Sequence, residues 1–189
     1  MIKALIFDMG NVLLNYDARK GALRFAKACK VPVMKIWVHF FTSEVEKSYT
    51  RGEISSREFF EHAKKVLRLP VDFKTFQYFW NDIFIENPGM EALLAELKKR
   101  YPLYLLSNTN AMHFDHIRKT YPHLFRHFRI AFPSHRVGHR KPDRQIYDAV
   151  LARIGLRPEE TIFIDDSPKF IEGAKKVGIH GILFRNILQ

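Results

Sequence analysis

The sequence has only one cysteine, Cys29, among its 189 residues, so no disulfide can form within the chain. This excludes the small secreted proteins that disulfides hold together, and it favours a reducing compartment. No apolar run approaches the about 18 residues of a membrane span. The segment VMKIWVHFF is short and broken by Lys35. Because the amino terminus also lacks a signal-peptide pattern, we expect a cytoplasmic protein with no membrane segment.

The sequence also lacks internal repeats, low-complexity tracts and flexible linkers. Hydrophobic residues make up 47% of the chain and aromatic residues 14%, which is typical of a packed globular protein. A chain of this length is long enough for one core, or for one core and a small accessory domain.

Acidic residues are outnumbered, 20 against 31 basic ones, which gives a net charge of +11. Such a balance suits nucleic acid, an anionic membrane or anionic small molecules. Most basic residues are scattered over predicted helices, but Arg136, Arg140, Lys141 and Arg144 cluster within nine positions. We interpret the cluster as attracting a phosphate ester and expect no nucleic-acid partner. The oligomeric state is not determined by the sequence.

Three short apolar runs each end on polar residues. IKALIF ends at Asp8, PLYLL at Ser107-Asn108, and TIFI at Asp165-Asp166. Such runs predict buried strands of a parallel sheet. Ligands of open α/β sheets bind at the carboxyl ends of the strands, so we expect these polar residues to meet at one edge.

Between the first two strands, about seventy positions carry apolar residues at helical spacing. Ser55 with Glu58 has capping-box spacing, and Asp72 can cap a helix that begins at Phe73. The pattern then alternates between strands and helices to the end of the chain. We predict an α/β fold, with a Rossmann-like, doubly wound parallel sheet as the catalytic core (residues 1–14 and 86–189) and a small α-helical cap inserted at 15–85.

Asp165 and Asp166 are adjacent carboxylates after a buried strand, and their repulsion is costly without a cation. Mg²⁺ resolves this cost because it prefers oxygen ligands and keeps substrate phosphate in its shell. Asp8 by itself is equally compatible with a turn cap. Ser107 and Asn108 offer donors to phosphate oxygens, and Lys141, unfavourable at a helix start, is better explained by facing phosphate and carboxylates.

Together these motifs resemble the haloacid dehalogenase-like hydrolases: FDMGNV around Asp8, Ser107, Lys141 in RKPD, and FIDDSPKFIEGA. GNVLLNYD, RGEIS and LSNTN look most like the sugar phosphatases of that family, such as α-D-glucose-1-phosphate phosphatase. The resemblance implies that Asp8 is the nucleophile. It implies Mg²⁺ ligands from Asp8, the Gly10 carbonyl and Asp166, with Asp165 assisting. It also implies that Ser107, Asn108 and Lys141 bind the phosphoryl group.

Gly10 departs from the family pattern, in which most phosphatases carry a second aspartate as general acid and base. Three explanations stay open: a cap residue or water takes that role, the leaving group needs little help, or turnover is weak. General acid–base catalysis supplies about 10²–10⁴-fold, so the substitution matters.

Two other chemistries are disfavoured. Dehalogenation would leave Asp165 and Asp166 without a counter-ion, and the histidine pairs 113/116 and 135/139 lack a third zinc ligand nearby. Four residues of the helical segment are conceivable contacts to the substrate: Trp37, His39, Glu46 and Arg51.

The sequence therefore predicts a Mg²⁺-dependent phosphatase for a small phosphorylated metabolite, such as a sugar phosphate. The alternatives are a phosphomonoesterase for nucleotides or other organic phosphates, and a protein that binds a phosphorylated ligand without turnover.

Overall fold

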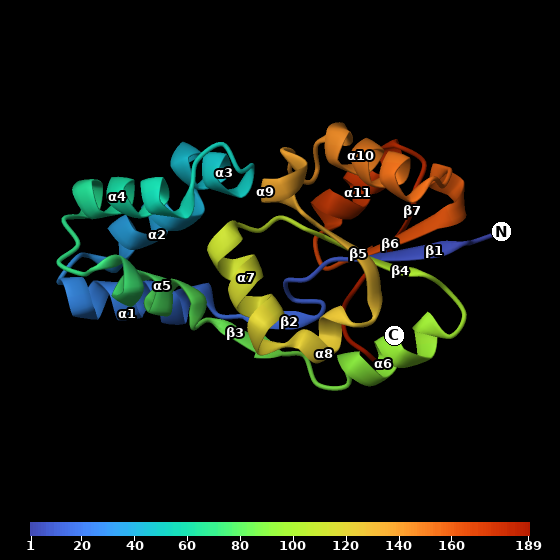
Figure 1. The fold of residues 1–189 in the computed structure, drawn as a ribbon, viewed down its shortest axis with the longest axis horizontal. Coiled ribbons are helices and arrows are strands. Elements are labelled where there is room, and N and C mark those ends of the chain that lie inside the picture. The colour runs from blue at the N-terminus through green and yellow to red at the C-terminus, as the bar shows by residue number, and fades with distance from the viewer.

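A five-stranded parallel sheet forms the centre of the protein, in the order β5-β4-β1-β6-β7 (Figure 1). The structure is a computed structural model that describes residues 1–189. The strands are β1 (Ala4–Phe7), β4 (Leu103–Ser107), β5 (Phe128–Pro133), β6 (Thr161–Asp165) and β7 (His180–Leu183). Phe7 pairs with Leu105 on one side and with Ile164 on the other, so the ends of β1, β4 and β6 lie side by side.

Helices cover both faces of the sheet. On one face lie α6 (Met90–Lys98), α7 (Ala111–Thr120) and α8 (Pro122–Phe125), packed on Leu5, Phe7, Leu103 and Leu105. On the other face, α10 (Arg144–Ile154) and α11 (Pro168–Lys176) pack on Ala4, Ile6, Tyr104 and Leu106. Alternate residues of one strand thus belong to the apolar clusters on opposite faces of the sheet, because successive side chains of a strand point to opposite faces. The predicted doubly wound α/β fold is confirmed.

A second group of helices lies beside this sheet, at the left of Figure 1. It consists of α1 (Ala18–Cys29), α2 (Val33–Phe41), α3 (Glu44–Thr50), α4 (Ser56–Leu67) and α5 (Phe73–Asn81), which we call the helical cluster. Its apolar core is built around the rings of Phe25, Phe40, Phe59, Phe76 and Trp80, and also includes Met112 of α7. The division of the chain at residues 15 and 85 stays a prediction.

Two predicted helix starts in the helical cluster are present. Ser55 and Glu58 form a reciprocal capping box at the start of α4. Asp72 Oδ1 accepts a hydrogen bond of 2.8 Å from the Thr75 N–H at the start of α5. Each cap satisfies backbone N–H groups that a helix leaves without intrahelical partners, which is why local sequence sufficed to locate them.

A two-stranded antiparallel sheet was not expected from the sequence. β2 (Leu14–Tyr16) pairs with β3 (Phe84–Glu86), where the apolar pattern predicts that the α5 helix runs to Phe84. The helix ends at Asn81 instead. The physical reason is tertiary: residues 84–86 form backbone hydrogen bonds with a segment about seventy positions away, and local helical spacing cannot report such a partner.

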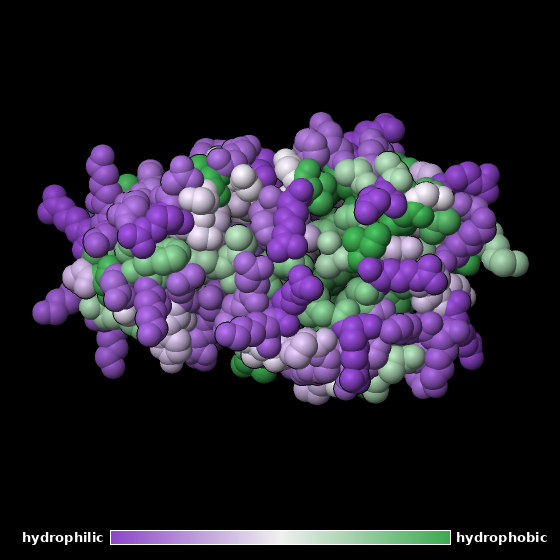
Figure 2. Space-filling model, in the orientation of Figure 1, coloured by the Kyte–Doolittle hydropathy of each residue, from purple (hydrophilic) through white to green (hydrophobic).

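Two short elements complete the fold, α9 (Ser134–Val137) and the 3₁₀ helix η1 (Pro158–Glu160). Hydrophilic residues cover most of the face in Figure 2, with smaller hydrophobic areas over the helical cluster and over the sheet domain, by which we mean the five-stranded sheet and the helices on its two faces.

No helix combines the length and apolar character needed to cross a bilayer.

Candidate active site

Three carboxylates meet at the carboxyl edge of the sheet, as the sequence predicts. Asp8 follows β1, and Asp165 and Asp166 stand at the end of β6. One ligand oxygen from each of the three residues lies within 4.8 Å of the others. Asp8 and Asp165 are buried and Asp166 is half-buried. The edge therefore concentrates negative charge in a place with little solvent.

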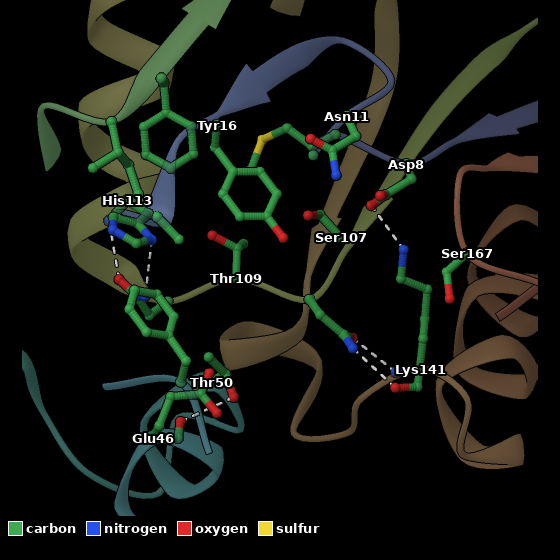
Figure 3. Close-up of a pocket in the computed structure, with 18 of the residues that line it drawn as sticks. Asp8, Asn11, Tyr16, Glu46, Thr50, Ser107, Thr109, His113, Lys141 and Ser167 are labelled. Atoms are coloured by element: carbon green, nitrogen blue, oxygen red, sulfur yellow. Dashed lines mark hydrogen bonds and ion pairs between the residues drawn. The ribbon is translucent and has the colours of Figure 1, made fainter. Parts of the chain in front are cut away.

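Lys141 lies between two of these carboxylates. Its Nζ donates to Asp8 Oδ1 at 2.7 Å and to Asp165 Oδ2 at 2.6 Å, and its side chain is 1% exposed. Burial lowers the pKa of the Lys141 ammonium, but Asp8 and Asp165 more than reverse this, so the net shift is upward. Lys141 is thus a permanent buried cation beside Asp8 (Figure 3).

Burial dominates the titration of Asp8. It raises the pKa of the Asp8 carboxyl to about 6; the Lys141 ammonium lowers this pKa, and the neighbouring Asp165 raises it. Asp165 behaves similarly: burial raises its pKa, and Lys141 opposes the shift. One ammonium does not fully compensate the carboxylates at this edge.

Asp165 and Asp166 have different surroundings. Asp165 is fully buried, and its Oδ1 accepts a hydrogen bond of 2.8 Å from the Ser167 N–H while Oδ2 accepts from Lys141. Asp166 lines the open cavity, and its Oδ2 accepts from Asn11 Nδ2 at 2.9 Å. The first carboxylate is therefore engaged in orienting Lys141, and the second is accessible to a ligand.

The residues that follow β4 also differ from one another. Ser107 is buried and lines the cavity, with no protein partner for its hydroxyl. The side-chain amide of Asn108 instead holds the Lys141 backbone, donating to its carbonyl at 2.9 Å and accepting from its N–H at 2.7 Å. Asn108 also lines the cavity, but its amide is already occupied.

The donor set fits a hard divalent cation. Asp8, Asp166 and the Gly10 segment line one cavity with oxygen atoms, and of the three clustered carboxylates only Asp8 and Asp165 are paired with the Lys141 ammonium. Oxygen ligands and an excess of negative charge are what Mg²⁺ requires of a site. No histidine or cysteine belongs to this cluster, so the set does not suit zinc.

A cavity of about 500 Å³ extends from these residues toward the helical cluster. Its lining toward the helical cluster is mostly aromatic and apolar, but also contains Glu46 and Thr50. The apolar residues are Tyr16, Trp37, Phe40, Phe41, Trp80, Ile83 and Phe84. Several polar groups at this end already have partners within the protein. The two ring nitrogens of His113 contact the Asn110 amide and the Trp80 carbonyl, and burial lowers the His113 pKa to about 3.

Of the four substrate contacts expected from the helical cluster, two line the cavity and two do not. Trp37 and Glu46 line the cavity. His39 is buried in the helical cluster, stacked on His62, and Arg51 is paired with Glu53. Helical spacing does not reveal which face of a helix meets a distant loop.

Two of the four clustered basic residues lie at the cavity, and the other two lie on the surface. Arg140 lines the cavity and pairs with Glu46 at 3.4 Å, and Lys141 reaches Asp8. Arg136 and Arg144 pair with Asp115 and Asp148 on exposed surface. Only the first two can act on a ligand in the cavity.

Tyr16 is one of the cavity residues that sequence reasoning missed. A Cβ atom added to Gly10 would lie 3.2 Å from Tyr16 Cε1 and 3.5 Å from Cδ1, so the ring covers Gly10 closely. Burial raises the pKa of the Tyr16 hydroxyl, and the charges of Asp166 and Asp8 add to this. The contact depends on a turn in which the Leu14 N–H donates to the Met9 carbonyl and so brings β2 alongside Gly10.

Comparison with known proteins agrees with this geometry. Residues 2–178 match the family model described as haloacid dehalogenase-like hydrolase. A solved structure of a family enzyme from Bacteroides thetaiotaomicron, in complex with magnesium and inorganic phosphate, has a TM-score of 0.90 at 28% identity. That alignment covers 99% of this chain and 96% of the other.

Among the curated relatives of this chain, two have names that describe phosphatases and one has a name that describes a cyclase. The D-ribitol-5-phosphate phosphatase of Bacteroides thetaiotaomicron is 25% identical over 94% of this chain and 89% of its own length. The sesquiterpene phosphatase astK of Aspergillus oryzae is 28% identical over 95% and 88%. Drimenol cyclase drtB of Aspergillus calidoustus is 26% identical over 97% of this chain, which spans only 34% of that longer protein.

Proposed function

The chain belongs to the haloacid dehalogenase-like hydrolases, and we propose that it is a Mg²⁺-dependent phosphomonoesterase with Asp8 as its nucleophile. At the coarser level, it is a phosphatase of this family for small phosphorylated compounds. One observation supports the proposal most: the buried Lys141 ammonium, which lines a cavity, bridges Asp8 and Asp165 beside Asp166.

Asp8 attacks phosphorus and forms an aspartyl phosphate, which divides hydrolysis into two displacements. Lys141, held by Asn108 and Asp165, compensates the charge of the phosphoryl oxygens and keeps Asp8 oriented. Ser107 donates its free hydroxyl to a phosphoryl oxygen. Asn108 binds the phosphoryl group through its backbone N–H, since its side-chain amide is engaged with Lys141.

The carboxylates of Asp8 and Asp166 and the carbonyl of Gly10 would hold Mg²⁺, with Asp165 assisting indirectly. When bound, the cation offsets the repulsion between the nucleophile and the incoming phosphate. The structure of the similar Bacteroides enzyme with magnesium and phosphate supports this choice of metal. A readout that needs no turnover is thermal stability, because a ligand bound only by the folded state raises its unfolding temperature. Mg²⁺ is expected to raise that temperature in the native protein and not in Asp166→Asn.

We assign the cap role to residues 15–85, and the core role to 1–14 and 86–189. The apolar core of the helical cluster, whose members other than Met112 lie within residues 15–85, supports this division. The cytoplasmic location inferred from the sequence stays a prediction.

The organic part of the substrate has two candidates. A sugar phosphate such as glucose 1-phosphate follows from the sequence resemblance, and its anomeric oxygen leaves more easily than an ordinary alkoxide. The aromatic wall favours a second candidate, an ester with a largely apolar organic group, because His113 and Asn110 have few hydrogen bonds left for sugar hydroxyls. The name of the sesquiterpene phosphatase is compatible with this second candidate.

Hydrolysis of p-nitrophenyl phosphate tests the proposal. Turnover is expected with Mg²⁺, none with a chelator, and none in Asp8→Asn. Asp148→Asn, the same change at an exposed carboxylate paired with Arg144, is the matched control and should retain activity. Turnover that survives in Asp8→Asn would refute the nucleophile, and absence of turnover in the native protein would favour a protein that only binds phosphorylated ligands.

A panel of phosphate esters then separates the substrate classes. Sugar phosphates, nucleoside monophosphates and isoprenoid monophosphates would be compared by kcat/KM. Preference for the isoprenoid esters would support the apolar candidate, and preference for glucose 1-phosphate would support the sugar candidate.

A further inference from the structure

The ring of Tyr16 lies where a side chain at position 10 would otherwise project. The segment between them turns back on itself: the Asn11 N–H donates to the Leu14 carbonyl at 2.7 Å, and the Leu14 N–H donates to the Met9 carbonyl at 3.0 Å. This turn brings the start of β2 alongside Gly10. A Cβ on Gly10 would approach the Tyr16 ring to 3.2 Å, so glycine at 10 and tyrosine at 16 fit together.

The hydroxyl of Tyr16 points into the middle of the cavity, on the side where Asp8 and Ser107 lie (Figure 3). It makes no hydrogen bond within the protein. The hydroxyls of Tyr49, Tyr121 and Tyr147, by contrast, are all hydrogen-bonded to protein groups. Tyr16 thus offers a free donor at the boundary between the phosphate end and the aromatic end of the cavity.

We propose that the Tyr16 hydroxyl is the proton donor to the leaving group, and that it performs the role for which Gly10 provides no side chain. This inference rests on the proposed phosphatase function. It assigns a specific group where the sequence left several explanations open: a cap residue, water, a leaving group that needs little help, or weak turnover.

Tyr16 gives one proton in the first displacement and takes one back in the second, so no other proton donor or acceptor is needed. In the first displacement, an Asp8 oxygen bonds to phosphorus, the bond from phosphorus to the ester oxygen breaks, and that oxygen takes the Tyr16 proton. The product alcohol leaves, and Tyr16 is a phenolate. In the second displacement, the phenolate accepts a proton from water while the water oxygen attacks phosphorus. The bond between the Asp8 oxygen and phosphorus breaks, so that inorganic phosphate forms and Asp8 regains its carboxylate. Tyr16 has then regained its proton.

A phenol suits this role at neutral pH. An ordinary tyrosine has a pKa of about 10, so the group is protonated when substrate binds. The leaving oxygen of an ester becomes strongly basic only as its bond to phosphorus breaks, and proton donation then gains most for the most basic leaving groups. The effect of Tyr16 should therefore depend on the leaving group.

Tyr16→Phe tests this dependence with a series of aryl phosphates, from p-nitrophenyl to phenyl and p-methoxyphenyl phosphate. The variant is expected to lower kcat/KM, which reports the first displacement and not the common hydrolysis of the aspartyl phosphate, by about 10²-fold or more for the most basic leaving group and only slightly for p-nitrophenyl phosphate. Tyr78→Phe, which removes the same hydroxyl from an exposed site in α5, is the control and should leave the whole series unchanged. An equal loss across the series, or no loss, would overturn the assignment.

A second pair of variants tests the shared space. Gly10→Asp alone should gain little activity, because its side chain meets the Tyr16 ring. Gly10→Asp combined with Tyr16→Ala should recover hydrolysis of phenyl phosphate relative to Tyr16→Ala alone. Failure of the double variant to exceed Tyr16→Ala, with both folded, would count against a proton-donor role.

The two proposals fail differently. If the native protein shows no turnover that depends on Asp8, the proposed function fails, and Tyr16 is examined by a crystal structure with orthovanadate. The Tyr16 hydroxyl is expected within about 3.2 Å of the apical oxygen that stands for the leaving group. A hydroxyl that points away from this oxygen overturns the inference whatever the turnover.

Discussion

Asn108 holds Lys141 in place through both ends of its side-chain amide. Asn108 Nδ2 donates to the Lys141 carbonyl at 2.9 Å, and Asn108 Oδ1 accepts from the Lys141 N–H at 2.7 Å. The backbone of Lys141 is thus tied to the end of β4, while its ammonium reaches the ends of β1 and β6 through Asp8 and Asp165. One asparagine fixes the loop that supplies the buried cation.

Asn108→Asp should lower kcat more than it raises KM. The aspartate keeps an acceptor for the Lys141 N–H but loses the donor, and its charge repels the Lys141 carbonyl. A displacement of the Lys141 ammonium by about 1 Å can lower the rate about 10²-fold. Asn186→Asp makes the same charge change at an exposed position and should retain full activity. An unchanged kcat in Asn108→Asp would show that the loop keeps its geometry without the amide.

Lys141→Met should destabilise the protein as well as abolish phosphatase activity. Removing one partner of a buried ion pair leaves uncompensated charge, at a cost of about 3–5 kcal/mol. Asp165 is then a fully buried carboxylate without its cation, so adding Asp165→Asn should restore part of the lost stability. The free energy of unfolding in urea measures both variants. A double variant less stable than Lys141→Met would contradict the idea that Asp165 serves mainly to hold Lys141.

Gly52→Ala should loosen the contact between the helical cluster and the sheet domain. Gly52 has a φ of 75°, and an added Cβ would lie 2.0 Å from the His135 carbonyl oxygen. Nearby, the buried Ser134 hydroxyl donates to the Thr50 carbonyl at 2.6 Å. We expect a higher KM together with lower stability, because Glu46 and Thr50 line the cavity just before this contact.

Gly138→Ala separates backbone strain from this close approach. Gly138 has a similar φ of 83°, but nothing lies within 4 Å of an added Cβ. Its loss of stability should be about 1–2 kcal/mol, the cost of a left-handed conformation alone. A loss in Gly52→Ala no larger than in Gly138→Ala, with an unchanged KM, would show that the contact yields easily.

Two histidines buried in the neutral form should contribute stability that is lost in mild acid. Burial, with a contribution from His62, lowers the pKa of His39 to about 4, and burial lowers that of His113 to about 3. An unfolded histidine has a pKa of about 6.5. Between pH 6.5 and 4 these two histidines therefore bind more protons in the unfolded chain, so their contribution to the free energy of unfolding falls as the pH falls. The raised pKa of Asp8 acts in the opposite direction, because the folded state keeps that proton up to about pH 6.

His39→Phe isolates one of these groups. The His39 Nε2 atom is buried without a hydrogen-bond partner, so the substitution removes a titrating group without breaking a bond at that atom. The slope of stability against pH should decrease by up to one proton. His180→Phe makes the same change at an exposed position and should leave the slope unchanged. Thermal unfolding between pH 4.5 and 7.5 measures the difference, and equal slopes in all three proteins would contradict the prediction.

The amino-acid sequence by itself determined the elements that depend on near neighbours. Apolar runs located β1, β4 and β6, and the Ser55 and Asp72 caps located two helix starts. Because parallel strands end at one edge, it also determined that Asp8, Ser107 and Asp166 would meet. These features follow from local periodicity, short-range hydrogen bonding and one rule of sheet topology.

Only the tertiary structure decided which of these residues face the cavity and which support others. It separated Asp165, turned toward Lys141, from its neighbour Asp166, and it showed that the Asn108 amide is engaged. It also brought Tyr16 over Gly10 through the turn between Met9 and Leu14, and it paired β2 with the distant β3. Such contacts join segments whose local sequence carries no record of the partner, because packing and backbone pairing between distant segments select them.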